Sequence, residues 1–166
     1  MLFEEVKILD SDRFTDFRGD IFTTYKKSNF EPSLDFVHDK YSTSRKSVLR
    51  GIHGDFETWK LVSCLYGELY FVVVDNRKES DTYLKWDWMV LDDKQRKQVL
   101  LPPGFGNGFY VLSDQALFSY KLSYPNEYVD ANKQFTLKWD DPRINIYWPN
   151  KNPLLQKRDN SDQHSR

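Results

Sequence analysis

One histidine, His53, lies between two cationic side chains in a stretch that otherwise has the composition of a β-strand. Arg50 precedes it and Lys60 follows it, and a β-branched and aromatic run then leads through a Gly67–Glu68 turn to Asp75. Imidazole titrates near neutral pH, so His53 is suited to act as a general base. Arg50 and Lys60 are suited to stabilise negative charge that develops on a substrate oxygen.

Proton transfer beside a carbonyl also requires an acid on the other face of the substrate. Tyr120, in the strand-like FSYKL, is one of ten tyrosines that could supply that proton. A carboxylate partner would orient the His53 ring and favour the imidazolium formed after abstraction. The residue types alone favour a second interpretation: a satisfied core histidine, a packed strand tyrosine and two solvated cations. Both interpretations stay open at this point.

Other chemistries have less support in the sequence. The chain has one cysteine and three histidines, His38, His53 and His164, with no His-x-His pair, so a histidine-rich metal site is not expected. Neither a Gly-x-Ser-x-Gly elbow nor a cysteine set up for acylation occurs. The chain also lacks GxGxxG and GxxxxGK(S/T), which argues against Rossmann and P-loop nucleotide sites.

The charge balance and the cysteine content restrict the partners and the compartment. The chain has 24 basic and 25 acidic residues and a net charge of −1, which argues against a nucleic-acid binder. Cys64 lies in an apolar run and has no second cysteine to pair with, which predicts a reducing compartment. The N-terminus is too charged for a signal peptide, and no apolar run approaches the ~20 residues that span a bilayer. A soluble cytoplasmic protein is expected.

The apolar pattern predicts strands throughout and no long helix. Strands are expected at 6–10 and 19–26 with a turn at DFRGD between them, and SNFEPSLD is expected to be a loop with at most one helical turn. TYLKWDWMVL alternates most clearly, with Leu84, Trp86, Trp88 and Val90 on one face of a half-buried strand. Further extended runs occur at FVHDKYSTS, QVLLP, FYVL, ALFSYKL and QFTLKW.

Strands at this spacing predict a single all-β domain, as a double-sheet jelly roll or a small barrel that covers its sheet edges. Such a fold can hold a ligand inside, where polar side chains are costly unless they are used. We assign residues 1–159 to this domain and 160–166 to a polar tail that is expected to fray, with no role for His164.

Seven motifs follow one another along nearly the whole chain, from about Phe14 to Asp159. They are FTDFRGDIF, FVHDKYSTSRKSVLRGIH, WKLVSCLYGELYFVVVDNRKESDTYLKW, LLPPGFGNGFYVLSD, YKLSY, KWDDPRINIYWP and LLQKRD. In this order they resemble the dTDP-4-dehydrorhamnose 3,5-epimerase family. The short RGIHGD-x-x-T-x-K segment and the GN in GFGNGF are most similar to the branch that acts on GDP-linked 4-keto-6-deoxy-heptoses.

The resemblance implies a cupin jelly roll, a double-stranded β-helix with short helical turns, in a homodimer that exchanges N-terminal strands. It implies no metal or organic cofactor. The substrate class is a nucleotide-diphospho-4-keto-6-deoxy sugar, GDP-linked by branch likeness, with dTDP as the alternative. Protons at C3 and C5, both next to the C4 ketone, would leave and return on the opposite face through an enolate. The branch likeness also implies capsular polysaccharide biosynthesis.

The family's site residues can be placed by position in this sequence. His53 in RGIH matches the base, Asp159 in QKRD its carboxylate partner, and Tyr120 in YK the acid. Arg50 and Lys60 match residues that line the enolate oxygen and the sugar. The other matches are a nucleotide-diphosphate contact at Arg18, further substrate-binding positions at His38, Lys40, Ser42 and Asn107, and Asp75, which is expected to support Lys60.

Two departures from the family pattern concern the substrate, and three alternative functions stay open. Asn107 stands where histidine is common, and an amide cannot take a proton at neutral pH. The loop 124–132 is long, so either Tyr124 or Tyr128 could replace the family's second tyrosine. The alternatives are an epimerase that acts at C3 only or C5 only, a ketoisomerase, and a non-catalytic cupin that binds sugar nucleotides.

Overall fold

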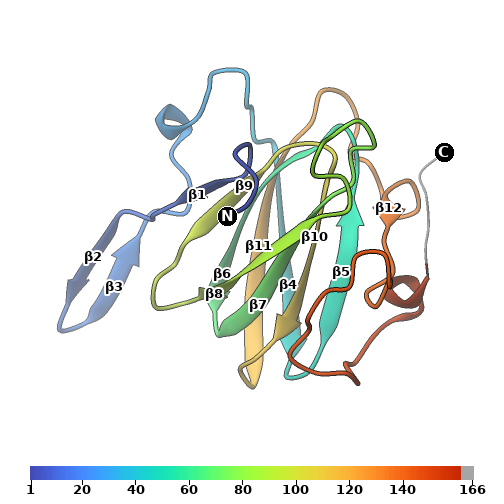
Figure 1. Ribbon diagram of the computed structural model, residues 1–166. Helices are drawn as coiled ribbons and strands as arrows, with labels where there is room; N and C mark the ends of the chain where they lie inside the picture. Colours follow the sequence, from blue (N-terminus) through green and yellow to red (C-terminus); the bar gives the residue numbers. More distant parts are fainter. Residues whose placement is uncertain (162–166) are drawn as a thin grey trace.

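Two five-stranded antiparallel sheets face each other, and a two-stranded hairpin projects from one side of them (Figure 1). The computed structural model describes residues 1–161, so the tail assigned to 160–166, with His164, lies almost wholly outside the described residues. The first sheet has the order β1 (Lys7–Leu9), β9 (Gln98–Leu101), β6 (Trp59–Tyr66), β11 (Gln115–Ser123), β4 (His38–Arg45). The second has the order β12 (Phe135–Thr136), β5 (Leu49–Gly54), β10 (Phe105–Val111), β7 (Glu68–Asp75), β8 (Trp86–Asp92).

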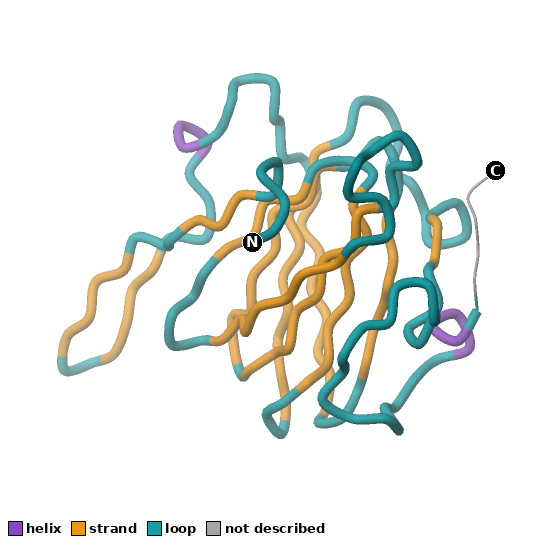
Figure 2. Tube along the Cα trace, viewed as in Figure 1, coloured by secondary structure: helices purple, strands orange, loops and turns teal. Residues whose placement is uncertain are grey.

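The remaining elements are short. The hairpin consists of β2 (Arg13–Asp16) and β3 (Gly19–Phe22), and the two 3-10 turns are η1 (Lys27–Asn29) and η2 (Lys157–Asn160). Figure 2 shows how little of the chain is helical. Within residues 1–161, no helix is long and apolar enough to cross a membrane. The all-β prediction is confirmed, and η1 is a single helical turn. The chain turns at DFRGD as expected, but the strand that precedes this turn is β2, which the sequence pattern did not predict.

The central strands β7 and β10 of the second sheet are buried on both faces, because one face covers the inter-sheet core and the other is covered by the C-terminal segment. Along β7, Leu69, Phe71 and Val73 belong to the core between the sheets. The alternate residues Tyr70, Val72 and Val74 pack under the C-terminal segment with its Leu137, Ile144 and Trp148. Side chains of a strand alternate between faces, so a strand that is buried on both sides needs the nearly continuous apolar run found here.

The C-terminal segment is fixed to β5 by backbone hydrogen bonds. Ile52 and Leu137 exchange two of them, at 3.3 and 3.0 Å, and the amide of Leu49 donates to the carbonyl oxygen of Leu154 at 3.0 Å. These bonds hold the coil along the open side of the second sheet, where Figure 1 shows it in orange and red. They bring η2, close to the end of the chain, against β5.

The alternation of the segment that contains β8 was predicted, and the structure shows which of its two faces meets the core between the sheets. The strand begins at Trp86, and Met89 and Leu91 face the core between the sheets. Trp88 lies on the outer face, 48% exposed, and stacks on Tyr70 with ring centroids 4.6 Å apart. The predicted strand 19–26 is also shorter, since β3 ends at Phe22.

The β2–β3 hairpin carries large apolar side chains that nothing else within residues 1–161 covers. Phe14, Ile21 and Phe17 are 63%, 72% and 97% exposed. Its attachment to the body includes two polar contacts, from Arg13 to the carbonyl oxygen of Lys94 at 2.5 Å and between Arg96 and Asp20 at 3.8 Å. Exposed apolar residues clustered on one small element are typical of a contact surface.

Candidate active site

A cavity of about 190 Å³ opens between the two sheets beside the connection from β5 to β6. Of the described residues that line it, four are cationic and one is a carboxylate, in addition to His53. This excess of positive charge suits a ligand that is anionic or becomes so during reaction. The charged lining residues are Lys40, Arg50, Lys60, Arg158 and Asp55.

The His53 ring lies against a buried carboxylate from the C-terminal turn. His53 Nε2 is 2.9 Å from Asp159 Oδ1, and Asp159 is 1% exposed. The carboxylate is held from behind, because Oδ1 also accepts a hydrogen bond from the amide of Gly51 at 3.2 Å and Oδ2 one from the amide of Gln156 at 3.3 Å. The structure therefore brings together the two ends of the dyad suggested by the motifs.

Burial and charge act in opposite directions on the His53 imidazole. Desolvation lowers the pKa of His53 and is the largest effect, while the Asp159 carboxylate raises it and the Arg158 and Lys60 cations lower it. The net result is a pKa below the usual 6.5, so the ring is neutral at pH 7. A neutral imidazole beside a fixed carboxylate can accept a proton and become a stabilised cation.

Lys60 is a buried ammonium fixed at the inner wall of the cavity. Its Nζ donates to the carbonyl oxygen of His53 at 3.2 Å and to Oδ1 of Asn107 at 3.1 Å. Burial lowers the pKa of Lys60 to about 8, and the charge of Asp55 is the main opposing effect. Because an ammonium has three donors, one remains for a substrate oxygen.

Tyr120 enters the cavity from the first sheet, while His53 enters from the second. In β11, Tyr120 pairs in register with Lys40 of β4 and Val62 of β6, and its ring packs edge-on to Phe118 with centroids 4.7 Å apart. Burial raises the pKa of Tyr120, with the Arg50 cation the largest opposing effect. The Tyr120 hydroxyl therefore stays protonated in the resting protein and can act as a general acid towards a basic carbon of a bound substrate.

Of the two candidate second tyrosines, Tyr128 lines the cavity and Tyr124 does not. Lys40 Nζ lies 3.2 Å from the Tyr128 hydroxyl and 5.0 Å from the centre of its ring. His38 packs on the far side of Tyr128 at 4.9 Å between ring centroids and meets the Tyr124 hydroxyl at 3.4 Å. His38 thus supports Tyr128 from outside the cavity, whereas Lys40 reaches the lining.

The family model described as dTDP-4-dehydrorhamnose 3,5-epimerase matches residues 1–165. This chain belongs to that family. The dTDP-4-dehydrorhamnose 3,5-epimerase of Shigella flexneri is 39% identical over 162 residues, which are 93% of this chain and 88% of the relative. The expected enzyme class, a nucleotide-sugar epimerase, is confirmed.

Solved structures of similar proteins agree with the fold. The dTDP-6-deoxy-D-glucose-3,5-epimerase of Legionella pneumophila, in complex with dTDP-4-keto-L-rhamnose, matches with a TM-score of 0.88 and 34% identity over 96% of this chain and 87% of that one. A 3'-monoepimerase from Streptomyces bikiniensis, in complex with dTDP-quinovose, matches with a TM-score of 0.86 and 26% identity, over 96% and 83% of the two chains. The cupin jelly roll is confirmed.

Most of the expected site residues of this epimerase meet at the cavity, and Arg18 does not. The cavity is lined by His53, Tyr120 and Arg50, and Asp159 lies against the His53 ring. Arg18 sits at the tip of the β2–β3 hairpin, paired with Asp16 at 2.6 Å and with its side chain 70% exposed. Within one chain, Arg18 therefore contributes nothing to the cavity. The expected positions that line the cavity are His53, Tyr120, Arg50, Lys60, Lys40, Ser42 and Asn107.

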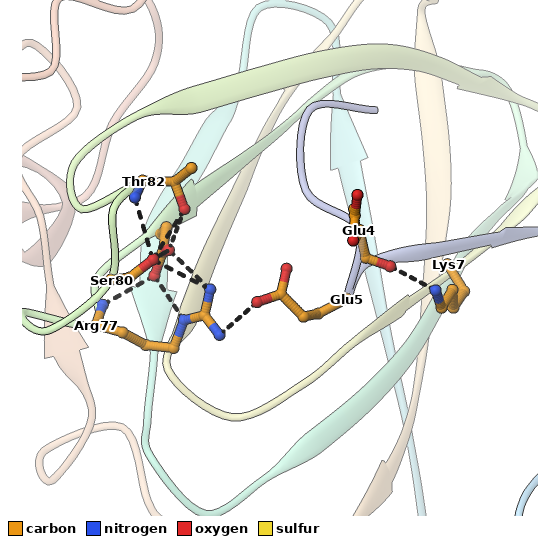
Figure 3. Close-up of polar contacts among 7 residues, drawn as sticks. Glu4, Glu5, Lys7, Arg77, Ser80 and Thr82 are labelled. Atoms are coloured by element: carbon orange, nitrogen blue, oxygen red, sulfur yellow. Dashed lines mark hydrogen bonds and ion pairs between the residues drawn. The ribbon is translucent and has the colours of Figure 1, made fainter.

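The prediction that Asp75 supports Lys60 is wrong. Asp75 is fully buried at the end of β7, where its carboxylate pairs with Arg77 at 2.8 Å and accepts hydrogen bonds from Ser80 and Thr82, both at 2.6 Å. Arg77 in turn pairs with Glu5, and Figure 3 shows it reaching from Ser80 and Thr82 towards Glu5. Asp75 braces the β7–β8 connection, because the backbone turns back immediately after it and brings these partners within reach.

Sequence reasoning missed several residues of the cavity. Asp55 and Thr58 lie in the β5–β6 connection, and Gln134, Gln156 and Arg158 come from the C-terminal half. Asp55 could have been found, since it stands two residues after His53 and alternate residues of an extended chain share a face. The positions of Gln134, Gln156 and Arg158 depend on how the C-terminal segment folds back over β5. No cluster of three or more His, Cys, Asp or Glu side chains suited to hold a metal occurs within residues 1–161.

Proposed function

We propose that this epimerase inverts C3 and C5 of a nucleotide-diphospho-4-keto-6-deoxy sugar through an enolate. The observation that carries the proposal is the pairing of His53 with Asp159 in a cavity that also receives Tyr120 and two cations. A base and an acid that enter from opposite sheets can act on opposite faces of a sugar ring held between them. One base and one acid on opposite faces suffice to invert a carbon.

Each residue has a stated role in this proposal. His53 removes the proton next to the C4 ketone, and Asp159 stabilises the resulting imidazolium. Lys60 and Arg50 stabilise the enolate oxygen, and this lowers the free energy needed to remove the proton from carbon. Arg50 is held for this by hydrogen bonds to the hydroxyl of Ser44 at 2.9 Å and the carbonyl oxygen of Thr43 at 3.4 Å. Tyr120 returns a proton from the other side.

The nucleotide is proposed to be dTDP. The Shigella relative and the two structural neighbours named above all carry dTDP in their descriptions, so a dTDP-4-keto-6-deoxyglucose is the first substrate to test. The GDP-linked heptose expected from the short RGIHGD segment has no counterpart among these relatives. It stays a prediction, as do a role in capsular polysaccharide biosynthesis and a cytoplasmic location.

The number of inverted carbons separates the main proposal from its first alternative. The relatives include 3,5-epimerases and a 3'-monoepimerase, so the fold serves both outcomes. We favour double epimerisation because the matching family model is that of the 3,5-epimerases. An epimerase acting at one carbon would use the same His53 base.

Solvent exchange tests this proposal directly. The protein is incubated with dTDP-4-keto-6-deoxyglucose in deuterated water, and in parallel with a GDP-linked 4-keto-6-deoxy sugar, and the product is analysed by mass spectrometry and NMR. Two deuterium atoms, at C3 and C5, are expected. One deuterium supports a single-site epimerase, a moved carbonyl a ketoisomerase, and no exchange with intact binding a non-catalytic cupin.

We also propose that residues 1–159 form one domain that works as a homodimer. The exposed Phe14, Phe17 and Ile21 of the hairpin would be covered by a second copy, as exchanged N-terminal strands require. Arg18 at the tip would then reach the partner's cavity, where a cation suits the diphosphate of the substrate. This arrangement explains why the motif that contains Arg18 lies outside the cavity of its own chain.

A further inference from the structure

The connection between β5 and β6 closes one end of the cavity and carries two buried polar groups. Asp55 follows directly after β5, two residues beyond His53, and Thr58 directly precedes β6, two residues before Lys60. Both line the cavity, and they are only 3% and 1% exposed. They lie next to the base and the ammonium of the proposed reaction.

One oxygen of Asp55 is used to shape the connection, and the other is not. Oδ1 accepts hydrogen bonds from the amides of Glu57 at 2.9 Å and Thr58 at 2.7 Å. The backbone is fixed as well, because the carbonyl oxygen of Asp55 accepts from the amide of Gly104 at 2.8 Å. The orientation of the carboxylate is therefore set by the chain itself.

Asp55 Oδ2 and Thr58 Oγ1 are buried and have no hydrogen-bond partner among residues 1–161. A buried carboxylate oxygen without a donor is unfavourable, so such atoms are retained where a ligand satisfies them. The Lys60 ammonium does not serve Asp55 in this way, since its bonds within the chain go to His53 and Asn107.

We propose that Asp55 and Thr58 form a subsite that binds a hydroxyl group of the sugar. The hydroxyl donates a hydrogen bond to Asp55 Oδ2 and lies beside Thr58 Oγ1. The proposal rests on the proposed function, which places the reacting sugar between His53 and Lys60. A diphosphate is excluded from this corner because the carboxylate would repel it. Neutral hydroxyls are the donors that a sugar ring offers next to its reacting carbons.

The subsite would be a determinant of specificity. A buried acceptor that is paired in one complex and unpaired in another discriminates strongly between sugars with and without the hydroxyl. It also gives the short interval between His53 and Lys60 a function, because the amides of Glu57 and Thr58 in this connection hold the Asp55 carboxylate.

The test compares Asp55→Asn and Thr58→Val with Glu57→Gln, a matched control that changes an exposed carboxylate in the same connection. Asp55→Asn keeps an acceptor for the amides of Glu57 and Thr58, and Thr58→Val keeps the shape of the side chain. The probes are dTDP-4-keto-6-deoxyglucose, for kcat/KM, and dTDP alone, for its inhibition constant. We expect kcat/KM to fall roughly 10- to 100-fold in Asp55→Asn and about 3- to 10-fold in Thr58→Val, with dTDP inhibition unchanged and Glu57→Gln like the wild type.

Three outcomes would overturn the subsite. These are an unchanged kcat/KM in Asp55→Asn, an equal loss of dTDP affinity, or a loss that disappears at pH 6, which would mean that Asp55 acts only through the charge of Lys60. The measurement at pH 6 separates contact from electrostatics, because Lys60, with a pKa of about 8, carries its charge at that pH. Thr58→Val gives a second check, because it leaves the charge of the site unaltered. Failure of the proposed function itself is distinguishable, because the wild-type protein would then exchange no sugar proton with either nucleotide.

Discussion

His53 Nε2 lies 2.9 Å from Asp159 Oδ1, so a strand of the second sheet and the last turn of the described chain meet at one pair of side chains. Two hydrogen bonds from backbone amides fix the carboxylate in place before the histidine is considered. The pair therefore depends on the C-terminal segment being docked along β5. The proposed base is therefore held by the C-terminal turn, whose Gln156 and Arg158 also line the cavity.

Replacing Asp159 should weaken the base without removing it. Because the Asp159 carboxylate raises the pKa of His53, Asp159→Asn is expected to lower that pKa further. The acid limb of the pH profile of kcat/KM should move to lower pH, and kcat at neutral pH should fall roughly 10²-fold. Asp141→Asn, which changes a buried carboxylate elsewhere in the C-terminal segment, serves as the control. An equal loss at every pH in both variants would mean that Asp159 only maintains the fold.

Lys60 should limit activity at high pH and reduce stability at neutral pH. Its pKa is about 8 in the folded protein against 10.5 in the unfolded chain, so between these values the unfolded state binds more protons. The free energy of unfolding should therefore rise as pH increases from about 8 to 10.5, while kcat/KM falls above pH 8 as the ammonium is lost.

The variant Lys60→Met separates these two roles of Lys60. Removing a buried charge should raise the free energy of unfolding at pH 7 by about 1–3 kcal/mol, since each unit of pKa corresponds to about 1.4 kcal/mol. Epimerisation should fall by at least about 10²-fold, because the enolate loses its buried cation. Denaturant unfolding at pH 7 and pH 10 measures the first effect. If Lys60→Met were less stable than the wild type at pH 7, the conclusion that burial of the Lys60 ammonium destabilises the fold would be wrong.

The sequence predicted those parts of the fold that depend on local residue patterns, such as the strands. It predicted the site only in part. Strand alternation predicted the elements, but not which face of β8 meets the core, because both faces carry large apolar residues and the C-terminal segment decides between them. The Asp75 error has a similar cause. Arg77, two residues away, competes with Lys60 for the carboxylate, and only the turn after β7 shows which cation is in reach. Asp55 stands two residues after His53, but nothing in the sequence reports that one of its carboxylate oxygens is buried without a partner among residues 1–161.

Tyr120→Phe should separate proton removal from proton return. The ring packs against Phe118, so loss of the hydroxyl leaves the packing intact and the variant should fold. His53 can still remove and replace a proton on its own face, so exchange of substrate hydrogens with deuterated water should persist at a measurable rate. Inversion should fall roughly 10²- to 10⁴-fold. Equal loss of exchange and inversion, measured by NMR of the recovered sugar nucleotide, would mean that Tyr120 is not the acid on the opposite face.

The hairpin provides the test of the proposed dimer. Phe17 is 97% exposed in one chain, so Phe17→Glu should leave the packing within the chain undisturbed while it places a charge in the proposed interface. Sedimentation should show a dimer for the wild type and a monomer for Phe17→Glu. The control variant Asp114→Lys changes an exposed side chain in the β10–β11 connection, outside the hairpin, and should remain dimeric. If Arg18 reaches the partner's cavity, Phe17→Glu and Arg18→Gln should both raise KM for the sugar nucleotide. Of these two variants, only Arg18→Gln should remain dimeric. A monomeric wild type with full activity would show that the hairpin has another partner and that Arg18 does not contact the diphosphate.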